Sequence, residues 1–220
     1  SNPYVYLMQS YSEDGGIANR LIRYTYRDGT LSEGTVLIGS ILGNTYHDGA
    51  RIAAGADGYL YITTGDAGRE SLSQDTSSLN GKVLRVTFDG DPAPGNPFGN
   101  EVFSYGHRNA QGLVFHPTNG LLYITEHGPR DNDEVAIVRE GENHGWPQVH
   151  GFCDNDVPGE DAFCADHDVT EPLAAWTPTI APAGADFYAS EAMNGWSGSL
   201  LFATLKGSAV VRLSFAEDGR

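Results

Sequence analysis

A short pattern of alternating apolar residues, placed behind a tight turn, recurs along this chain. The two clear copies are D-G-Y-L-Y-I-T-T-G-D at residues 57–66 and N-G-L-L-Y-I-T-E-H-G at residues 119–128. A fainter copy, S-G-S-L-L-F-A-T-L-K-G, covers 197–207, and we count N-P-Y-V-Y-L at 2–7 as the first. Successive copies lie about 55 to 80 residues apart, farther than the roughly 40–50 of compact propeller repeats. Each unit therefore has room for a turn, an inner strand and two or three outer strands, and radial stacking of such units gives a β-propeller.

The sequence predicts one all-β domain over residues 1–220, with about four propeller blades. The 28 glycines and 11 prolines favour short strands joined by tight turns. Alternation predicts strands over 4–10, 21–26, 35–41 and 81–88, and only a single helical turn within 68–79. The alternative is a β-sandwich whose repeats are fortuitous.

The charge balance excludes some partners. The net charge of −16 repels nucleic acid and anionic membrane surfaces. No apolar run approaches the roughly 20 residues that a membrane-spanning helix needs. The acidic balance is compatible with simple solubility and, equally, with binding of divalent cations.

The two cysteines, Cys153 and Cys164, flank an acidic loop that contains few apolar residues. A loop of this kind needs an external constraint, so we expect a disulfide and hence an oxidising compartment. Two reduced surface thiols are the alternative. A zinc site is disfavoured because there is no second cysteine pair and His167 stands alone.

Two polar clusters follow apolar, β-prone runs and are the candidate functional loops. They are Gly106-His107-Arg108-Asn109 and Glu126-His127-Gly128-Pro129. Loops at the ends of strands present side chains and bare carbonyl groups to a ligand. A purely structural loop has little need for arginine, asparagine, glutamate and histidine together, so we interpret these clusters as parts of a binding site.

The order of motifs along the chain resembles one family. The motifs are H-D-G-A-R, Y-L-Y-I-T-T-G-D, S-L-N-G-K-V-L-R, Y-G-H-R-N-A-Q-G-L, E-H-G-P, D-E-V, G-W-P, W-T-P-T-I-A-P and L-K-G. They resemble the soluble quinoprotein glucose/sorbosone dehydrogenases, also called aldose sugar dehydrogenases. The resemblance implies a six-bladed β-propeller that carries pyrroloquinoline quinone and calcium on its top face. It also implies an aldose substrate oxidised at the anomeric carbon to the lactone by hydride transfer to the quinone, an external electron acceptor, and a bacterial periplasmic or secreted location.

The resemblance assigns catalytic roles to three residues. His47 matches the general base that removes the proton of the anomeric hydroxyl, and Asp66 matches the carboxylate that orients it. Arg108 matches a residue that stabilises negative charge on the reduced cofactor. Without the family match, His47 would be a turn residue and Asp66 a turn cap.

The same resemblance assigns residues to the quinone. Arg108 and Asn109 match cofactor contacts, and Gln111 completes their motif as a weaker candidate. Thr179 matches a contacting threonine, and Lys206 matches a lysine that pairs with a cofactor carboxylate. A lysine placed simply on the surface is the alternative for Lys206. Trp176 is the candidate for an aromatic group that stacks in the site.

Calcium is expected at two places by the resemblance. The backbone carbonyls of Gly128 and Pro129 match ligands of the calcium that also holds the quinone, which suits a hard cation. Glu134, the carbonyl of His144 and Asp154 match a second calcium site. Salt bridges on a polar loop are the alternative for that second set.

The chain departs from the family pattern in length. Family members carry roughly two further blades, one before the residues equivalent to Ser1 and one after Arg220. We therefore expect a second chain, or a second copy, to cover the flanks near 4–6 and 210–213. Two other functions remain open: a calcium-stabilised propeller that binds a sugar or a protein partner without catalysis, and lactone hydrolysis, for which Glu126 is the only support.

Overall fold

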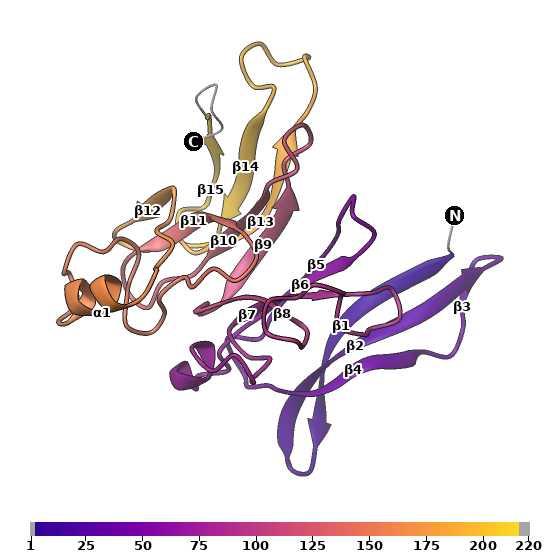
Figure 1. Cartoon of the computed structure of the whole chain (residues 1–220). Helices are drawn as coiled ribbons and strands as arrows, with labels where there is room; N and C mark the ends of the chain where they lie inside the picture. The colour runs from indigo at the N-terminus through magenta and orange to yellow at the C-terminus, as the bar shows by residue number, and fades with distance from the viewer. Residues whose placement is uncertain (1–2, 216–220) are drawn as a thin grey trace.

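The computed structural model describes residues 3–215, whose strands form four antiparallel sheets that follow one another in chain order (Figure 1). The first sheet contains β1 (Tyr4–Glu13), β2 (Gly16–Arg27), β3 (Thr30–Leu31) and β4 (Thr35–Leu42). The second contains β5 (Gly49–Ala54), β6 (Leu60–Thr64), β7 (Lys82–Val86) and β8 (Val102–Tyr105). The third contains β9 (Ala110–Phe115), β10 (Leu122–Glu126), β11 (Asp133–Val138) and β12 (Ala174–Trp176). The fourth contains β13 (Pro182–Tyr188), β14 (Ser199–Thr204) and β15 (Ala209–Leu213).

The sheets meet along their inner edges. β1 contacts β5, β5 contacts β9, and β9 contacts β13. The faces between neighbouring sheets are closed by apolar side chains; Ile62, Leu84 and Ile124 are each fully buried there. Sheets that share an axis through their edge strands and pack face to face are the blades of a β-propeller. The prediction of an all-β propeller arc with about four blades is confirmed.

The position of the repeat within each blade differs from the prediction of an inner strand. Its copies are β6, β10 and β14, and each is flanked by a strand on both sides. The repeat is the second strand of a blade, which explains why every residue of β6 and β10 is buried. By the same repeat, β1 corresponds to a second strand. The three longer strands of the first sheet, β1, β2 and β4, therefore match the last three strands of a blade. The three strands of the fourth sheet match the first three.

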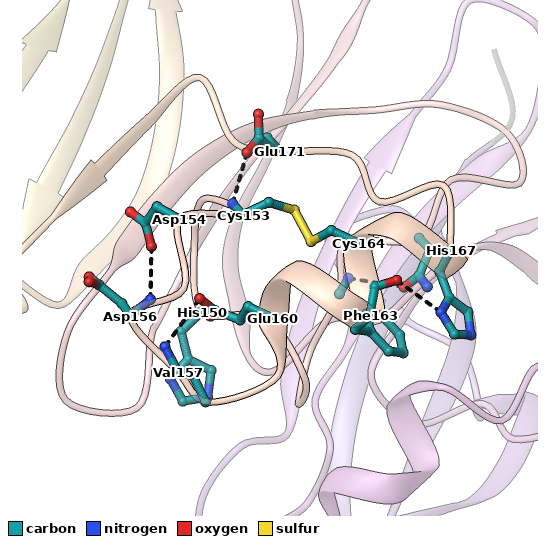
Figure 2. Close-up of a disulfide and its surroundings, with 12 residues drawn as sticks. His150, Cys153, Asp154, Asp156, Val157, Glu160, Phe163, Cys164, His167 and Glu171 are labelled. Carbon is teal, nitrogen blue, oxygen red and sulfur yellow. Dashed lines mark hydrogen bonds between the residues drawn. A yellow bond between two sulfur atoms is a disulfide. The ribbon is translucent and has the colours of Figure 1, made fainter.

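Helical structure is scarce, but the disulfide loop contains a helix that periodicity does not indicate. The expected turn within 68–79 is the 3₁₀ helix η1 (Glu70–Ser73). The unexpected element is α1 (Glu160–Asp166), whose seven residues are too few to show an amphipathic period. Cys153 and Cys164 form a disulfide that ties α1 to the preceding loop (Figure 2). The disulfide prediction is confirmed.

Removing this disulfide is expected to destabilise the domain. The two cysteines are 11 residues apart, and a crosslink that closes a loop of this size restricts the unfolded chain. Replacing both Cys153 and Cys164 with serine should lower the free energy of unfolding by about 3 kcal/mol, measured by denaturant titration. The wild-type protein should lose the same amount when a reductant is added, and the double variant should not respond to the reductant. Equal stability of wild type and variant would contradict this role.

The two flanks of the arc expose apolar side chains. On β1, Tyr4, Val5 and Leu7 are 37%, 41% and 45% exposed, and on β15 Val210 is 68% exposed. Within residues 3–215, each of these two strands has one edge without a strand partner. The prediction that another chain or a second copy covers these flanks stays a prediction. No helix in the described part of the chain has the length and apolar character to cross a membrane.

Candidate functional site

The loops at one end of the sheets lie together and contain most of the predicted site residues. Asp66 N–H donates to Arg108 O at 2.9 Å, which joins the loop after β6 to the loop before β9. His127 N–H donates to Asn109 O at 3.3 Å, which joins the next loop to the same turn. The loops at this end are residues 43–48, 65–69, 106–109, 127–132, 177–181 and 205–208. Each connects the last strand of one blade to the next blade, or the second strand of a blade to its third.

His47 and Asp66 form a hydrogen-bonded pair in these loops. His47 Nδ1 lies 2.8 Å from Asp66 Oδ1, and the same oxygen accepts the Gly68 N–H at 2.7 Å. Asp66 is completely buried, whereas the His47 side chain is 18% exposed. Because the carboxylate accepts, Nδ1 is the protonated nitrogen, and Nε2 is left without a hydrogen-bond partner among residues 3–215. With its proton on Nδ1, the imidazole has Nε2 as the nitrogen that can accept a proton.

Gly65 allows the backbone of His47 to approach the loop after β6. A Cβ at position 65 would lie 1.8 Å from His47 O and 2.3 Å from His47 C. The His47 carbonyl is instead held by the Ala67 N–H at 3.0 Å. His47 itself has a φ of 60°, a conformation that is uncommon for residues other than glycine. The position of His47 thus depends on the glycine of the T-G-D motif.

Glu126 fixes the turn that carries Arg108. Its Oε1 accepts the backbone N–H groups of Arg108 and of Asn109, the latter at 2.8 Å. Its Oε2 accepts His107 Nδ1–H at 2.9 Å, and His107 Nε2 contacts Ser104 Oγ at 2.8 Å. Glu126 is 3% exposed, so its carboxylate is committed to the protein. It is not presented to solvent, and the one observation favouring lactone hydrolysis is therefore removed.

The Arg108 side chain contacts the backbone of the Glu126-His127-Gly128-Pro129 cluster and the ring of Trp146. Its Nη1 donates to His127 O at 3.1 Å and to Gly128 O at 2.9 Å, and its guanidinium carbon lies 5.2 Å from the centre of the Trp146 ring. Burial lowers the pKa of Arg108, while the carboxylate of Asp66 acts in the opposite direction. Arg108 Nε is buried and has no partner in the described structure, so the guanidinium has a donor to spare.

Asn109 and Gln111 are oriented by each other. Gln111 Nε2 donates to Asn109 Oδ1 at 2.9 Å, and the same oxygen accepts the Gly49 N–H at 3.2 Å. Asn109 is 6% exposed. This network fixes the amide plane of Asn109 beside the first residue of β5 and leaves its Nδ2 group as the available donor.

Thr179 and Lys206 come from the last two loops and contact each other. Lys206 Nζ donates to Thr179 Oγ1. Asp133 ties this region to the calcium-ligand candidates, since Oδ2 accepts the Ile180 N–H and Oδ1 accepts the Gly128 N–H, at 2.6 and 2.9 Å. One buried carboxylate therefore holds the Gly128 turn and the Thr179 loop in register.

A small cavity lies behind the Arg108 turn. It has a volume of about 20 Å³, enough for one water, and Pro129, Glu134 and His144 line it together with Arg108. Burial raises the pKa of Glu134 well above its usual range, and the charges of two neighbouring acidic residues raise it further. Burial lowers the pKa of His144 well below its usual range, and its Nε2 has no hydrogen-bond partner among the described residues, with Glu142 Oε2 4.0 Å away.

Only two of the three residues predicted for the second calcium site lie near each other. Glu134 and His144 line the same cavity, but Asp154 does not. Asp154 is exposed, and its Oδ1 accepts the Asp156 N–H at 3.2 Å. Among residues 3–215, no three side chains of histidine, cysteine, aspartate or glutamate form a metal-binding group. The assignment of Asp154 to a metal stays a prediction.

Trp176, the stacking candidate, packs on Phe202 with ring centres 5.5 Å apart.

Sequence reasoning missed two residues of the site. Trp146 was noted only within the G-W-P motif, yet its indole N–H reaches Asp66. Lys82 is fully buried, and its ammonium donates to the carbonyls of Leu72, Ser73 and Asn80, which supports η1 beneath the Arg108 turn. The chain has only two lysines, Lys82 and Lys206, and Lys82 lies in the S-L-N-G-K-V-L-R motif; a rare charged residue within a β-prone run is the signal that could have found it.

Comparisons with known proteins agree with this arrangement. The family model for glucose/sorbosone dehydrogenase matches residues 1–220. The aldose sugar dehydrogenase YliI of Escherichia coli is 33% identical over 79% of this chain, and quinoprotein glucose dehydrogenase B of Acinetobacter calcoaceticus is 34% identical over 70%. The solved PQQ-bound form of aldose sugar dehydrogenase from Streptomyces coelicolor is 34% identical, covers 99% of this chain and superposes with a TM-score of 0.82.

The chain is shorter than these relatives. It spans 50% and 39% of the two sequences and 60% of the solved structure. The family match nevertheless extends over the whole chain, and this range includes the loops of the His47–Asp66 pair and of the Arg108 turn. This chain belongs to the glucose/sorbosone dehydrogenase family.

Proposed function

We propose that this chain carries the catalytic loops of an enzyme that oxidises aldose sugars at the anomeric carbon to lactones, with pyrroloquinoline quinone as bound oxidant and calcium as its companion ion. The observation that carries the proposal is the His47–Asp66 pair, which leaves His47 Nε2 without a hydrogen-bond partner among residues 3–215, beside the Arg108 turn. Family membership supports dehydrogenase chemistry, and the pair supplies the base that such chemistry needs.

The residues present fit the quinone. Pyrroloquinoline quinone is an anion, and Arg108 and Lys206 bring positive charge to the same end of the sheets. Arg108 keeps one unpartnered buried donor, and Thr179 and Asn109 add a hydroxyl and an amide. These are the groups that bind carboxylate and carbonyl oxygens. We assign Gln111 to the orientation of Asn109.

Calcium also fits the residues present. The carbonyls of Gly128 and Pro129 are hard oxygen donors in a turn held by Asp133. Glu134 is buried with a raised pKa caused first by burial and then by Glu126 and Asp133, so a cation nearby would offset unfavourable charge. The Arg108 contact with Gly128 O must loosen to free that oxygen for calcium.

Each residue then has a defined task. Pyrroloquinoline quinone, when bound, supplies a two-electron acceptor. His47 Nε2 takes the proton of the anomeric hydroxyl as the lactone carbonyl forms. Asp66 holds the imidazole in the required tautomer and stabilises the imidazolium. Arg108 stabilises negative charge that develops beside it. Turnover would also require an external electron acceptor to take up the two electrons from the bound cofactor. The disulfide supports a periplasmic or secreted location.

A steady-state assay tests this function. The protein that carries this chain is incubated with calcium, a panel of aldoses and a dye as electron acceptor, with and without pyrroloquinoline quinone. We expect dye reduction only when quinone and an aldose are both present. Binding of calcium or sugar without any dye reduction would instead favour the non-catalytic propeller.

Calcium removal is expected to destabilise the protein. A cation that binds only the folded state stabilises it by about 2.7 kcal/mol at a hundred times its Kd, which for a domain of this size corresponds to a melting temperature about 5–10 °C higher. Adding a chelator should remove this increment, and excess calcium should restore it. Magnesium is the matched control, because it demands shorter bonds and octahedral geometry and should not restore the melting temperature. A transition unchanged by chelator would argue against calcium at Gly128 and Pro129.

A further inference from the structure

Trp146 links parts of the site that are distant in sequence. It is 6% exposed, and its Nε1–H donates to Asp66 Oδ2 at 2.9 Å across 80 residues of sequence. Asp66 Oδ1 is already occupied by His47 and by the Gly68 N–H. The tryptophan therefore supplies the only donor to the second oxygen among residues 3–215.

The indole ring also contacts two other side chains. The Arg108 guanidinium carbon lies 5.2 Å from the ring centre. The His150 ring stacks on the indole with centres 5.1 Å apart and an interplanar angle of 28°. His150 is fixed in turn, because its backbone N–H donates to Glu160 Oε1 at 2.8 Å (Figure 2). Glu160 is fully buried at the start of α1. The disulfide loop therefore holds His150, which in turn packs against Trp146.

We propose that Trp146 is a positioning residue for the His47–Asp66 pair and for Arg108. A buried carboxylate that loses one of its donors is left with an unsatisfied oxygen, which is costly. The Asp66 carboxylate would then rotate to share both of its oxygens among its remaining donors, His47 and the Gly68 N–H, and this rotation would move Oδ1 from the position that fixes the His47 ring. The effect of Trp146 on turnover rests on the proposed function. Its effect on the position and tautomer of His47 does not, because it depends only on contacts within this chain.

A simple core tryptophan would behave differently. If Trp146 only fills space, an isosteric ring without the N–H should preserve the state of His47, because packing is unchanged. If Trp146 positions the pair, loss of the N–H alone should disturb His47. The decisive change is therefore replacement of Trp146 by β-(3-benzothienyl)alanine, which keeps the bicyclic shape and has sulfur in place of N–H. Trp146→Phe is the genetically simple version, and Trp196→Phe is the matched control, distant from the site.

The test is made first on cofactor-free protein by NMR. Nitrogen shifts of His47, assigned by comparison with His47→Gln, should show a single tautomer protonated at Nδ1 in the wild type and in Trp196→Phe. The benzothienyl variant should show a mixture of both tautomers. A single unchanged tautomer in that variant would overturn the proposal. The wild-type Trp146 indole N–H should also be protected from hydrogen exchange, and rapid exchange would overturn the proposal without any variant.

Kinetics then separate the two claims. With quinone and calcium bound, Trp146→Phe should lower kcat about tenfold and leave KM within about twofold, since the loss concerns the base and not sugar binding. Equal kcat for variant and wild type would refute the catalytic consequence. If the wild type oxidises no aldose, the proposed function fails, while the NMR result still decides whether Trp146 positions His47.

Discussion

His47→Ala should lower turnover by at least about 100-fold while leaving the affinity for quinone nearly unchanged. The imidazole is the only group that we assign to the proton of the anomeric hydroxyl, and general-base catalysis contributes about 10²–10⁴ to such reactions. Removing the ring takes away this transfer without touching Arg108 or Lys206, which we assign to the cofactor. The measurement is kcat by steady-state assay and the quinone Kd by titration, each for the wild type and for His47→Ala.

Asp66→Asn tests the same pair by changing the carboxylate partner of His47. An asparagine cannot hold the imidazole in the tautomer that leaves Nε2 free, so turnover should fall by a similar factor. His167→Ala changes an exposed histidine at the C-cap of α1; it serves as the control and should retain wild-type turnover. If His47→Ala lost quinone binding and turnover to the same degree, His47 would be a structural or cofactor residue instead of the base.

Gly65→Ala should abolish most activity through the backbone alone. The added methyl group would lie 1.8 Å from His47 O, so the loop carrying the base must move. Displacement of a catalytic group by about 1 Å costs on the order of 10²-fold in rate, and we expect a loss of at least that size. The measurement is kcat, accompanied by the melting temperature.

The control for this substitution is Gly39→Ala, which makes the same chemical change in β4. There the new Cβ would have a normal contact of 3.6 Å with Val36, so turnover should be unaffected. Wild-type turnover in Gly65→Ala would mean that the close approach of residues 47 and 65 is not needed for catalysis.

Strands such as β4 and β7 could be predicted from sequence because each is a β-prone run bounded by turns. The repeat revealed β6, β10 and β14, but it could not tell that they are second strands, since burial on both sides depends on their neighbours in the sheet. The helix α1 was missed because seven residues do not show a helical period, and its position depends on the disulfide.

The site was predicted in part, and what was missed has a common cause. His47 and Asp66 were found through motifs, and the structure brings them to 2.8 Å. The contact of Trp146 with Asp66 joins residues 80 positions apart, so no local pattern indicates it. Glu126 was known as part of a polar cluster, but its task is to accept backbone N–H groups, and such partners leave no trace in the sequence.

The central claim is tested most directly by one anaerobic spectrum. The protein that carries this chain is loaded with calcium and one equivalent of pyrroloquinoline quinone, and an aldose is added without any other electron acceptor. We predict that the absorption of the bound quinone is replaced by that of the quinol, with one lactone formed per quinone, and that His47→Ala binds the quinone but is reduced at least about 100-fold more slowly. A quinone that binds and is not reduced by any aldose would contradict the account.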